Sequence, residues 1–143
     1  MILDNWPTMR LDNWPARLDT VVETRRNSPF WWGVNDCMLW PADVVLALTG
    51  KDPAVEFRNS YSTATAAMRI VKKHGGMEQL ISKQLGFEPS LDIFPMRGDV
   101  VLFGPESKLC GGVCLGTQAA FVDKEGLSFI SIASVDKRVW RIT

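Results

Sequence analysis

The sequence predicts an α+β domain in which N-terminal helices pack on a C-terminal antiparallel β-sheet. Every segment with a clear helical spacing of apolar residues lies before residue 90. From Arg97 onward the pattern changes to short β-rich runs that are separated by turn residues. Helices followed by strands are typical of α+β domains, whose sheets are antiparallel. With 143 residues, the chain fits one domain with a substantial core.

A short internal repeat marks the N-terminal segment. Residues 3–7 and residues 11–15 carry the same sequence, LDNWP. In the second copy, we expect Asn13 to cap a helix and Pro15 to occupy its first turn. The first copy precedes no helix of its own. We therefore expect residues 1–10 to form an extended arm and residues 11–143 to form the domain.

The arm carries apolar side chains that have no local face to pack against. These are Leu3, Trp6 and Pro7. Tryptophan is enriched among the residues that dominate binding at protein interfaces, so we expect this segment to bind a partner protein. The alternative is that Trp6 folds back onto its own domain.

An aspartate and a glycine delimit the second helix. We expect Asp36 to cap an apolar run from Met38 to Leu48, and Gly50 to end it. Pro41 lies inside this helix and cannot donate a hydrogen bond to the carbonyl of Cys37. Two more helices are expected at 63–73 and 77–85. Strands are expected at 99–103, 112–115, 119–122, 127–132 and 138–142.

Composition narrows the classes of function. The formal net charge is zero, which gives no bulk attraction to nucleic acid or to anionic lipid. The chain begins without a basic segment followed by an apolar one, and no apolar run is long enough to span a bilayer. Cys110 and Cys114 lack companion ligands. We expect free thiols, no metal, no cofactor, no nucleic-acid partner and no membrane partner.

Cys37 is the strongest candidate for a catalytic residue. It lies at the start of the second helix, where unpaired N–H groups and the helix dipole stabilise a thiolate. A cysteine nucleophile also needs a base, and the only histidine is His74. The neighbours of His74, two lysines and a glycine pair, suit an exposed helix end instead. Cys37 is therefore an active nucleophile, a vestigial one, or a small buried apolar residue.

Other residues have a chemical and a structural interpretation. Asp36 either orients a catalytic group or only caps the helix. Asp99, after a glycine and before a strand, is expected to stabilise a turn. The spacing of Cys110 and Cys114 predicts different environments for the two thiols. Four tryptophans are expected to line the core or a glycan-binding cleft: Trp31, Trp32, Trp40 and Trp140.

Two motifs resemble those of the papain-like NlpC-type cell-wall peptidases. Residues 32–37 resemble the nucleophile motif of these enzymes, and residues 97–103 resemble the Gly-Asp strand that follows it. Aligning the next strand puts Cys110, or a glycine beside it, where the enzymes carry the base histidine. It puts Val122 or Asp123 where they carry the residue that orients the base. The resemblance implies a papain-like fold that lacks the catalytic pair.

A closer resemblance covers nearly the whole chain. The chain is similar to a family of small tailed-phage and prophage proteins related to NlpC-type peptidases encoded in tail-tip gene clusters. This resemblance implies a structural or accessory protein near the tail hub or baseplate of a long-tailed phage or gene-transfer particle, made in the host bacterial cytoplasm and located in the virion tail. The matching segments are 14–18, 29–33, 35–37, 42–43, 48–53, 97–101, 111–113 and 139–142.

Two functions from different classes follow. The first is a structural or docking component of a tail tip, built on a catalytically degenerate papain-like domain. The second is an active cysteine peptidase or amidase that cuts peptidoglycan stem peptides during genome entry. In that enzyme Cys37 would attack an amide carbonyl, and His74 or another chain would supply the base. The missing base favours the first function.

Overall fold

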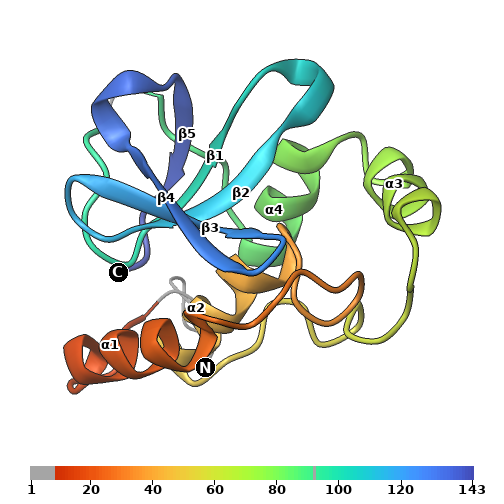
Figure 1. Ribbon diagram of the computed structural model, residues 1–143. Coiled ribbons are helices and arrows are strands. Elements are labelled where there is room, and N and C mark those ends of the chain that lie inside the picture. Colours follow the sequence, from red (N-terminus) through yellow and green to blue (C-terminus); the bar gives the residue numbers. More distant parts are fainter. Residues whose placement is uncertain (1–8, 92) are drawn as a thin grey trace, which may run out of the picture.

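The computed structural model describes residues 9–91 and 93–143 of the chain. Within these residues, four α-helices precede a five-stranded antiparallel sheet, which confirms the predicted α+β class (Figure 1). The helices are α1 (Trp14–Arg25), α2 (Leu39–Thr49), α3 (Ala64–Lys73) and α4 (Met77–Leu85). The strands are β1 (Val100–Phe103), β2 (Cys110–Cys114), β3 (Gln118–Asp123), β4 (Gly126–Ser131) and β5 (Lys137–Trp140). Two 3-10 turns are η1 (Glu106–Lys108) and η2 (Ile132–Ser134).

The helix ends follow the predicted signals closely. The predicted first cap, Asn13, occupies the N-cap position of α1, but its side chain makes no capping hydrogen bond. Thr63 caps α3 by accepting a hydrogen bond from the Ala66 N–H at 3.1 Å. Gly50 ends α2 in the left-handed conformation, with φ of 80°. This conformation is one that glycine adopts without strain.

The strands run in the order β4-β3-β2-β1-β5, and every neighbouring pair is antiparallel. β2 begins at Cys110, two residues earlier than predicted, because Gly111 and Gly112 pair with β1 despite the low strand propensity of glycine. β5 ends at Trp140, two residues earlier than predicted. There the Ile142 N–H donates to the carboxylate of Asp99 at 3.0 Å instead of continuing the ladder.

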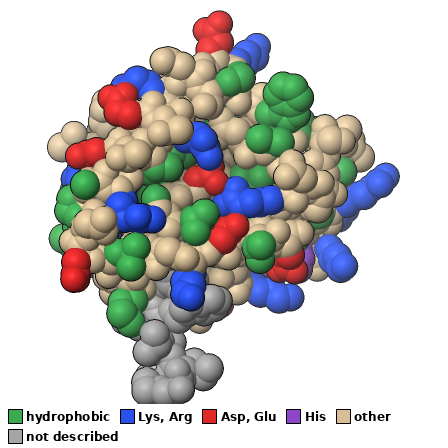
Figure 2. Space-filling model, turned by 90° about the horizontal axis from the view of Figure 1, so that it is seen from below, with side chains coloured by type: hydrophobic (Ala, Val, Ile, Leu, Met, Phe, Trp, Pro, Cys, Tyr) green, Lys and Arg blue, Asp and Glu red, His purple; other side chains and the backbone are tan. Residues whose placement is uncertain are grey.

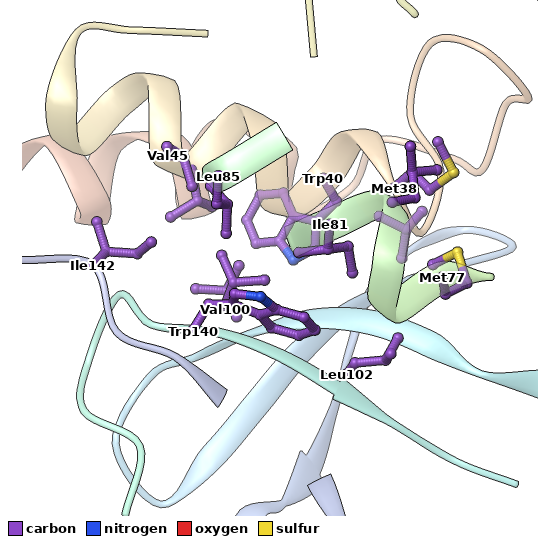
Figure 3. Close-up of a cluster of buried hydrophobic side chains, with 14 of the residues drawn as sticks. Met38, Trp40, Val45, Met77, Ile81, Leu85, Val100, Leu102, Trp140 and Ile142 are labelled. Carbon is purple, nitrogen blue, oxygen red and sulfur yellow. The ribbon is translucent and has the colours of Figure 1, made fainter. Parts of the chain in front are cut away.

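The main core lies between the helices and one face of the sheet. Trp40 of α2 and Trp140 of β5 are both fully buried in it, and both indole rings are seen in Figure 3. Each indole N–H has a partner: the Trp40 Nε1 donates to the Ala120 carbonyl at 2.9 Å, and the Trp140 Nε1 donates to the Ser82 Oγ at 3.2 Å. Two of the four predicted core tryptophans thus anchor helices onto the sheet.

The opposite face of the sheet carries a second, smaller cluster. Residues of β1 alternate between the two, with Val100 and Leu102 in the main core and Val101 and Phe103 in the smaller cluster. This alternation is the two-residue period of a strand. Cys110 and Cys114 both pack in the smaller cluster, so the prediction of different environments for the two thiols is wrong. Four residues apart on one strand, they share a sheet face.

Asp99 joins the two ends of the described chain. Its side chain is fully buried and accepts hydrogen bonds from Arg141 Nε at 2.7 Å, from the Ile142 N–H at 3.0 Å and from Arg10 Nη2 at 3.3 Å. It also accepts from the Met96 N–H at 2.9 Å, which is the predicted turn-stabilising role. Asp99 is therefore both a turn residue and the link between the N-terminal and C-terminal segments.

The face of the molecule seen from below carries charges of both signs. There, Lys and Arg side chains are intermixed with Asp and Glu over most of the area (Figure 2). In the part of the chain that the structure describes, no helix has the length and hydrophobicity needed to cross a bilayer.

Candidate cysteine site

The turn before α2 is built around the buried carboxylate of Asp36. Its Oδ1 accepts hydrogen bonds from the N–H groups of Met38 and Leu39, at 3.0 and 2.9 Å. Its Oδ2 accepts from the Gly33 N–H at 2.9 Å and from the hydroxyl of Tyr61 at 2.5 Å. Met38 occupies the N-cap position of α2, and Asp36, two residues earlier, binds the N–H groups of Met38 and Leu39 at the start of the helix, as the sequence predicted.

Cys37 lies in the turn before α2, two residues ahead of its first residue, Leu39. Its position is close to the predicted first helical turn, yet the environment does not activate the thiol. Burial raises the pKa of Cys37 to about 12, and the nearby Cys110 thiol and Asp36 carboxylate act in the same direction. The N–H groups of Gly111 and of Cys37 itself favour the thiolate but do not offset the burial.

Pro41 and Gly111 close the space beside Cys37. The carbonyl of Cys37, which Pro41 leaves without its helical partner, packs against Gly111 of β2. A Cβ added at Gly111 would lie far inside van der Waals contact of that carbonyl oxygen and 3.3 Å from the Pro41 ring. Any side chain at this position would have to push α2 away from the sheet.

The positions that the NlpC resemblance assigns to the catalytic pair hold no catalytic groups. Gly111 faces α2, whereas Cys110 packs in the cluster on the opposite face of the sheet. Of the two candidates for the orienting residue, Val122 is buried in the main core and Asp123 is exposed. Asp123 accepts hydrogen bonds from the Lys124 N–H and the Ser128 hydroxyl within its own hairpin.

His74 belongs to the end of α3, as predicted. Its imidazole packs edge-on against Phe57 with 5.8 Å between ring centroids, and its backbone N–H donates to carbonyls of the last turn of α3, including that of Ile70. Among the described residues, the groups that shift the pKa of the Cys37 thiol belong to Asp36, Cys110, Gly111 and Cys37 itself, and His74 is not one of them. The structure therefore does not bring the only histidine to the only helix-start cysteine.

The other thiols are also held in their neutral forms. Burial raises the pKa of Cys110 to about 11, and the charge of Asp123 adds to this shift while Lys108 opposes it. Burial also raises the pKa of Cys114. All three cysteines are free, and no group of three or more potential metal ligands gathers within residues 9–91 and 93–143.

The residues predicted to bind a partner, Leu3, Trp6 and Pro7, lie outside the described residues. The last residue of the predicted arm is described and is anchored in the domain. Arg10 donates from Nε to the Ile142 carbonyl at 2.6 Å, and its guanidinium lies 4.1 Å from the centre of the Trp14 ring. Leu11 follows with an N–H bond of 2.7 Å to the Leu48 carbonyl. The domain thus includes Arg10.

Two features of the site were missed by sequence reasoning. The first is Tyr61, whose pKa is raised by burial and by its bond to Asp36. The second is a buried ion network in which Asp43 of α2 accepts from Arg58 at 2.7 Å and from Arg25 at 3.2 Å. Asp43 carried a signal, a charged residue in an otherwise apolar helix. Tyr61 carried none, because it lies 25 residues from its partner.

The two main surface hollows of the described residues lie away from Cys37. One of about 450 Å³ runs along α1 and is lined by residues that include Arg17, Thr20 and Ala47. Another of about 400 Å³ lies on α3. Neither is lined by Cys37.

Trp31 lies on the surface. Its side chain is 65% exposed, although the sequence predicted that it would line the core or a cleft.

Of three comparisons with known proteins, one finds a match, and it is to a protein family. No curated protein and no solved structure matches the chain. A family model described as a domain of unknown function, DUF6950, matches residues 9–142, and its first matched residue adjoins the anchored Arg10. Because this match covers nearly the whole chain, the protein belongs to the DUF6950 family.

Proposed function

We propose that this protein is a structural or docking component of the tail tip or baseplate of a phage, prophage or gene-transfer particle, built on a catalytically degenerate papain-like domain. One observation carries the non-catalytic part of the proposal. Gly111, beside Cys110 at the place where the resemblance puts the base, lies against the carbonyl of Cys37 and has no room for a side chain. A cysteine hydrolase needs a base within hydrogen-bond reach of its thiol.

The order of the elements supports the papain-like part of the proposal. A cysteine precedes a buried helix, and an antiparallel sheet follows whose Gly-Asp strand, β1, lies next to the strand that contacts the cysteine. The proposed location in a tail rests on the resemblance of sequence segments such as 97–101 and 139–142 to tail-tip proteins. The partners we propose are tail hub or baseplate proteins, bound through the segment that contains Leu3, Trp6 and Pro7.

Particle assembly tests the docking role. Deleting residues 1–8 leaves Arg10 and Leu11 in place, with their bonds to Ile142 and Leu48. We therefore expect the thermal unfolding of the isolated domain to stay nearly unchanged, while incorporation into particles, measured by mass spectrometry of purified virions, falls sharply. Trp6→Ala should reproduce most of this loss, whereas Asn5→Ala in the same segment should not. A melting temperature lowered by several degrees with normal incorporation would contradict the proposal.

A turnover assay tests the loss of catalysis. The purified protein should release no product from muropeptides, because Cys37 has a raised pKa and no base. The matched control is Cys37→Ala, which should be indistinguishable from the wild type. Cleavage by the wild type that disappears in Cys37→Ala would restore the alternative, an active peptidase or amidase that binds peptidoglycan stem peptides.

A further inference from the structure

The loop between α4 and β1 exposes large apolar side chains. Phe94 is 74% exposed and Met96 is 59% exposed, and Leu91 is exposed as well. The residues beside them are covered, since Ile93 packs in the smaller cluster on the sheet and Pro95 is buried. Large apolar side chains that are exposed together are typical of an interaction surface.

Backbone hydrogen bonds hold this loop in place. Ser90 exchanges two of them with β5, at 2.8 and 3.0 Å. The Phe94 carbonyl accepts from Arg141 Nη2 at 2.7 Å, and the Met96 N–H donates to Asp99 Oδ2 at 2.9 Å. The exposed side chains therefore project from an anchored backbone. A partner that binds them loses less free energy to ordering than one that binds an unanchored loop.

A chain of hydrogen bonds joins the loop to Arg10. Arg10 Nη2 donates to Asp99 Oδ1 at 3.3 Å, and Arg141 Nε donates to Asp99 Oδ2 at 2.7 Å. The Nη2 atom of the same Arg141 side chain binds the Phe94 carbonyl. Trp6 precedes Arg10 by four residues, and four residues span at most about 14 Å. A protein that binds Trp6 therefore lies within reach of the loop.

The N-terminal segment is too short to form a stable interface alone. A specific protein–protein interface takes about 20–30 residues from each side, far more than residues 1–8 can supply. The remaining contacts have to come from the domain near Arg10. Met9 is exposed, and Phe94 and Met96 add two large apolar side chains. The loop thus extends the apolar character of the predicted binding residues onto the domain.

We propose that the partner bound by the N-terminal segment also binds Phe94 and Met96, so that one tail hub or baseplate protein covers both the segment and the loop. This inference rests on the proposed tail function and identifies a second part of the same interface. The partner surface should be apolar, because the charged side chains next to the loop are already paired with one another. Two linked contacts bind more tightly than either one alone, which gives the domain itself a role in docking.

Competition for incorporation tests the loop. Variant and wild type, carrying different tags, are produced in the same cells as the other particle proteins, and their ratio in purified particles is measured by mass spectrometry. We expect Phe94→Ser and Met96→Gln each to lower this ratio about tenfold or more, the effect of losing an interface hot spot. The melting temperature should not change, because both side chains are exposed. Met68→Gln is the matched control, since Met68 is 61% exposed but lies on α3.

Photo-cross-linking in purified particles identifies what covers the loop. Benzoylphenylalanine placed at position 94, and in a second variant at position 6, should cross-link to the same tail protein. Cross-links from the two positions to different proteins, or from position 94 to a second copy of this chain, overturn the proposal.

The outcomes separate this inference from the proposed function. Normal incorporation of Phe94→Ser and Met96→Gln, together with loss of Trp6→Ala, overturns the inference and leaves the docking role of the N-terminal segment intact. Particles that lack the wild-type protein overturn both. A melting temperature that Phe94→Ser lowers in the full chain, but not in the chain without residues 1–8, shows that the segment covers the loop of its own domain and also overturns the inference.

Discussion

At the scale of single residues, burial raises the pKa of Cys37, a cysteine close to a helix start, and the Cys110 thiol and then the Asp36 carboxylate add to this shift. Asp36 was predictable as a cap because an aspartate directly precedes an apolar helical run. Its negative charge, placed beside Cys37 to order the turn, also disfavours the thiolate. The helix N-terminus that would lower the pKa of a thiol has its first N–H groups already bound to Asp36. The same cap that forms the helix thus removes its activating effect.

Alkylation measures this effect directly. A thiol with a pKa of about 12 instead of 9.0 has roughly 1,000-fold less thiolate at neutral pH. Cys37 should therefore react with iodoacetamide about 1,000-fold more slowly in the folded protein than in denaturant, with the modified site identified by peptide mass spectrometry. Rapid modification of Cys37 at neutral pH, ahead of Cys110 and Cys114, would show that some other group activates it.

The raised pKa of Cys37 also makes the free energy of unfolding depend on pH. The folded-state pKa of Cys37 lies above its unfolded value, so burial of the neutral thiol stabilises the fold below about pH 9. That contribution is lost as the pH rises from 9 toward 12, where only the unfolded chain ionises readily.

At the scale of elements, the glycine pair of β2 sets how closely α2 approaches the sheet. Gly111 contacts the turn at Cys37, and Gly112 lies against the Ala120 carbonyl and the Phe103 ring. Neither glycine has a positive φ, so their role is close approach rather than an unusual backbone conformation. A side chain at Gly111 would push α2 away from the sheet, whereas one at Gly112 would press on the Ala120 carbonyl and the Phe103 ring of the neighbouring strands.

Gly111→Ala tests this packing. The added Cβ meets a backbone carbonyl that no side-chain rotation can move, so we expect the free energy of unfolding in urea to fall by about 1–3 kcal/mol. The alkylation rate of Cys37 should rise at the same time, because the contact that buries it is forced open. Cys110→Ala, next in the strand but on the opposite face, should change neither quantity as much. Unchanged stability in Gly111→Ala would mean that α2 and β2 are not in firm contact.

The sequence predicts most elements and few of the contacts between them. Helix α4 matches its predicted range of 77–85, because apolar spacing and a glycine at each end are local signals. The start of β2 was missed, because strand propensity disfavours glycine and only the contact with α2 accounts for Gly111. In the site, the cap by Asp36 was predictable. The Tyr61 and Asp43 networks were not, because their partners lie 15 to 25 residues away.

At the scale of the whole molecule, Asp99 holds the ends of the domain together. The Gly-Asp motif predicted a turn, and the turn is present, but the same carboxylate also receives Arg10 from one end of the domain and Arg141 from the other. A fully buried carboxylate needs such partners, since an unpaired buried charge is strongly destabilising. This link fixes Arg10 next to the C-terminal segment of the domain.

Asp99→Asn tests the link with almost no change in shape. The asparagine keeps one acceptor but leaves Arg10 and Arg141 without a counter-charge, so we expect a loss of about 3 kcal/mol or more in the free energy of unfolding. Asp19→Asn is the matched control. It removes the ion pair with Arg97, which is exposed at both partners and should contribute about 1 kcal/mol at most. Hydrogen exchange at Leu11, whose N–H is bonded to Leu48, should accelerate in Asp99→Asn alone. Equal effects of the two substitutions would show that the ends are held by the core, and that Asp99 is only a turn residue.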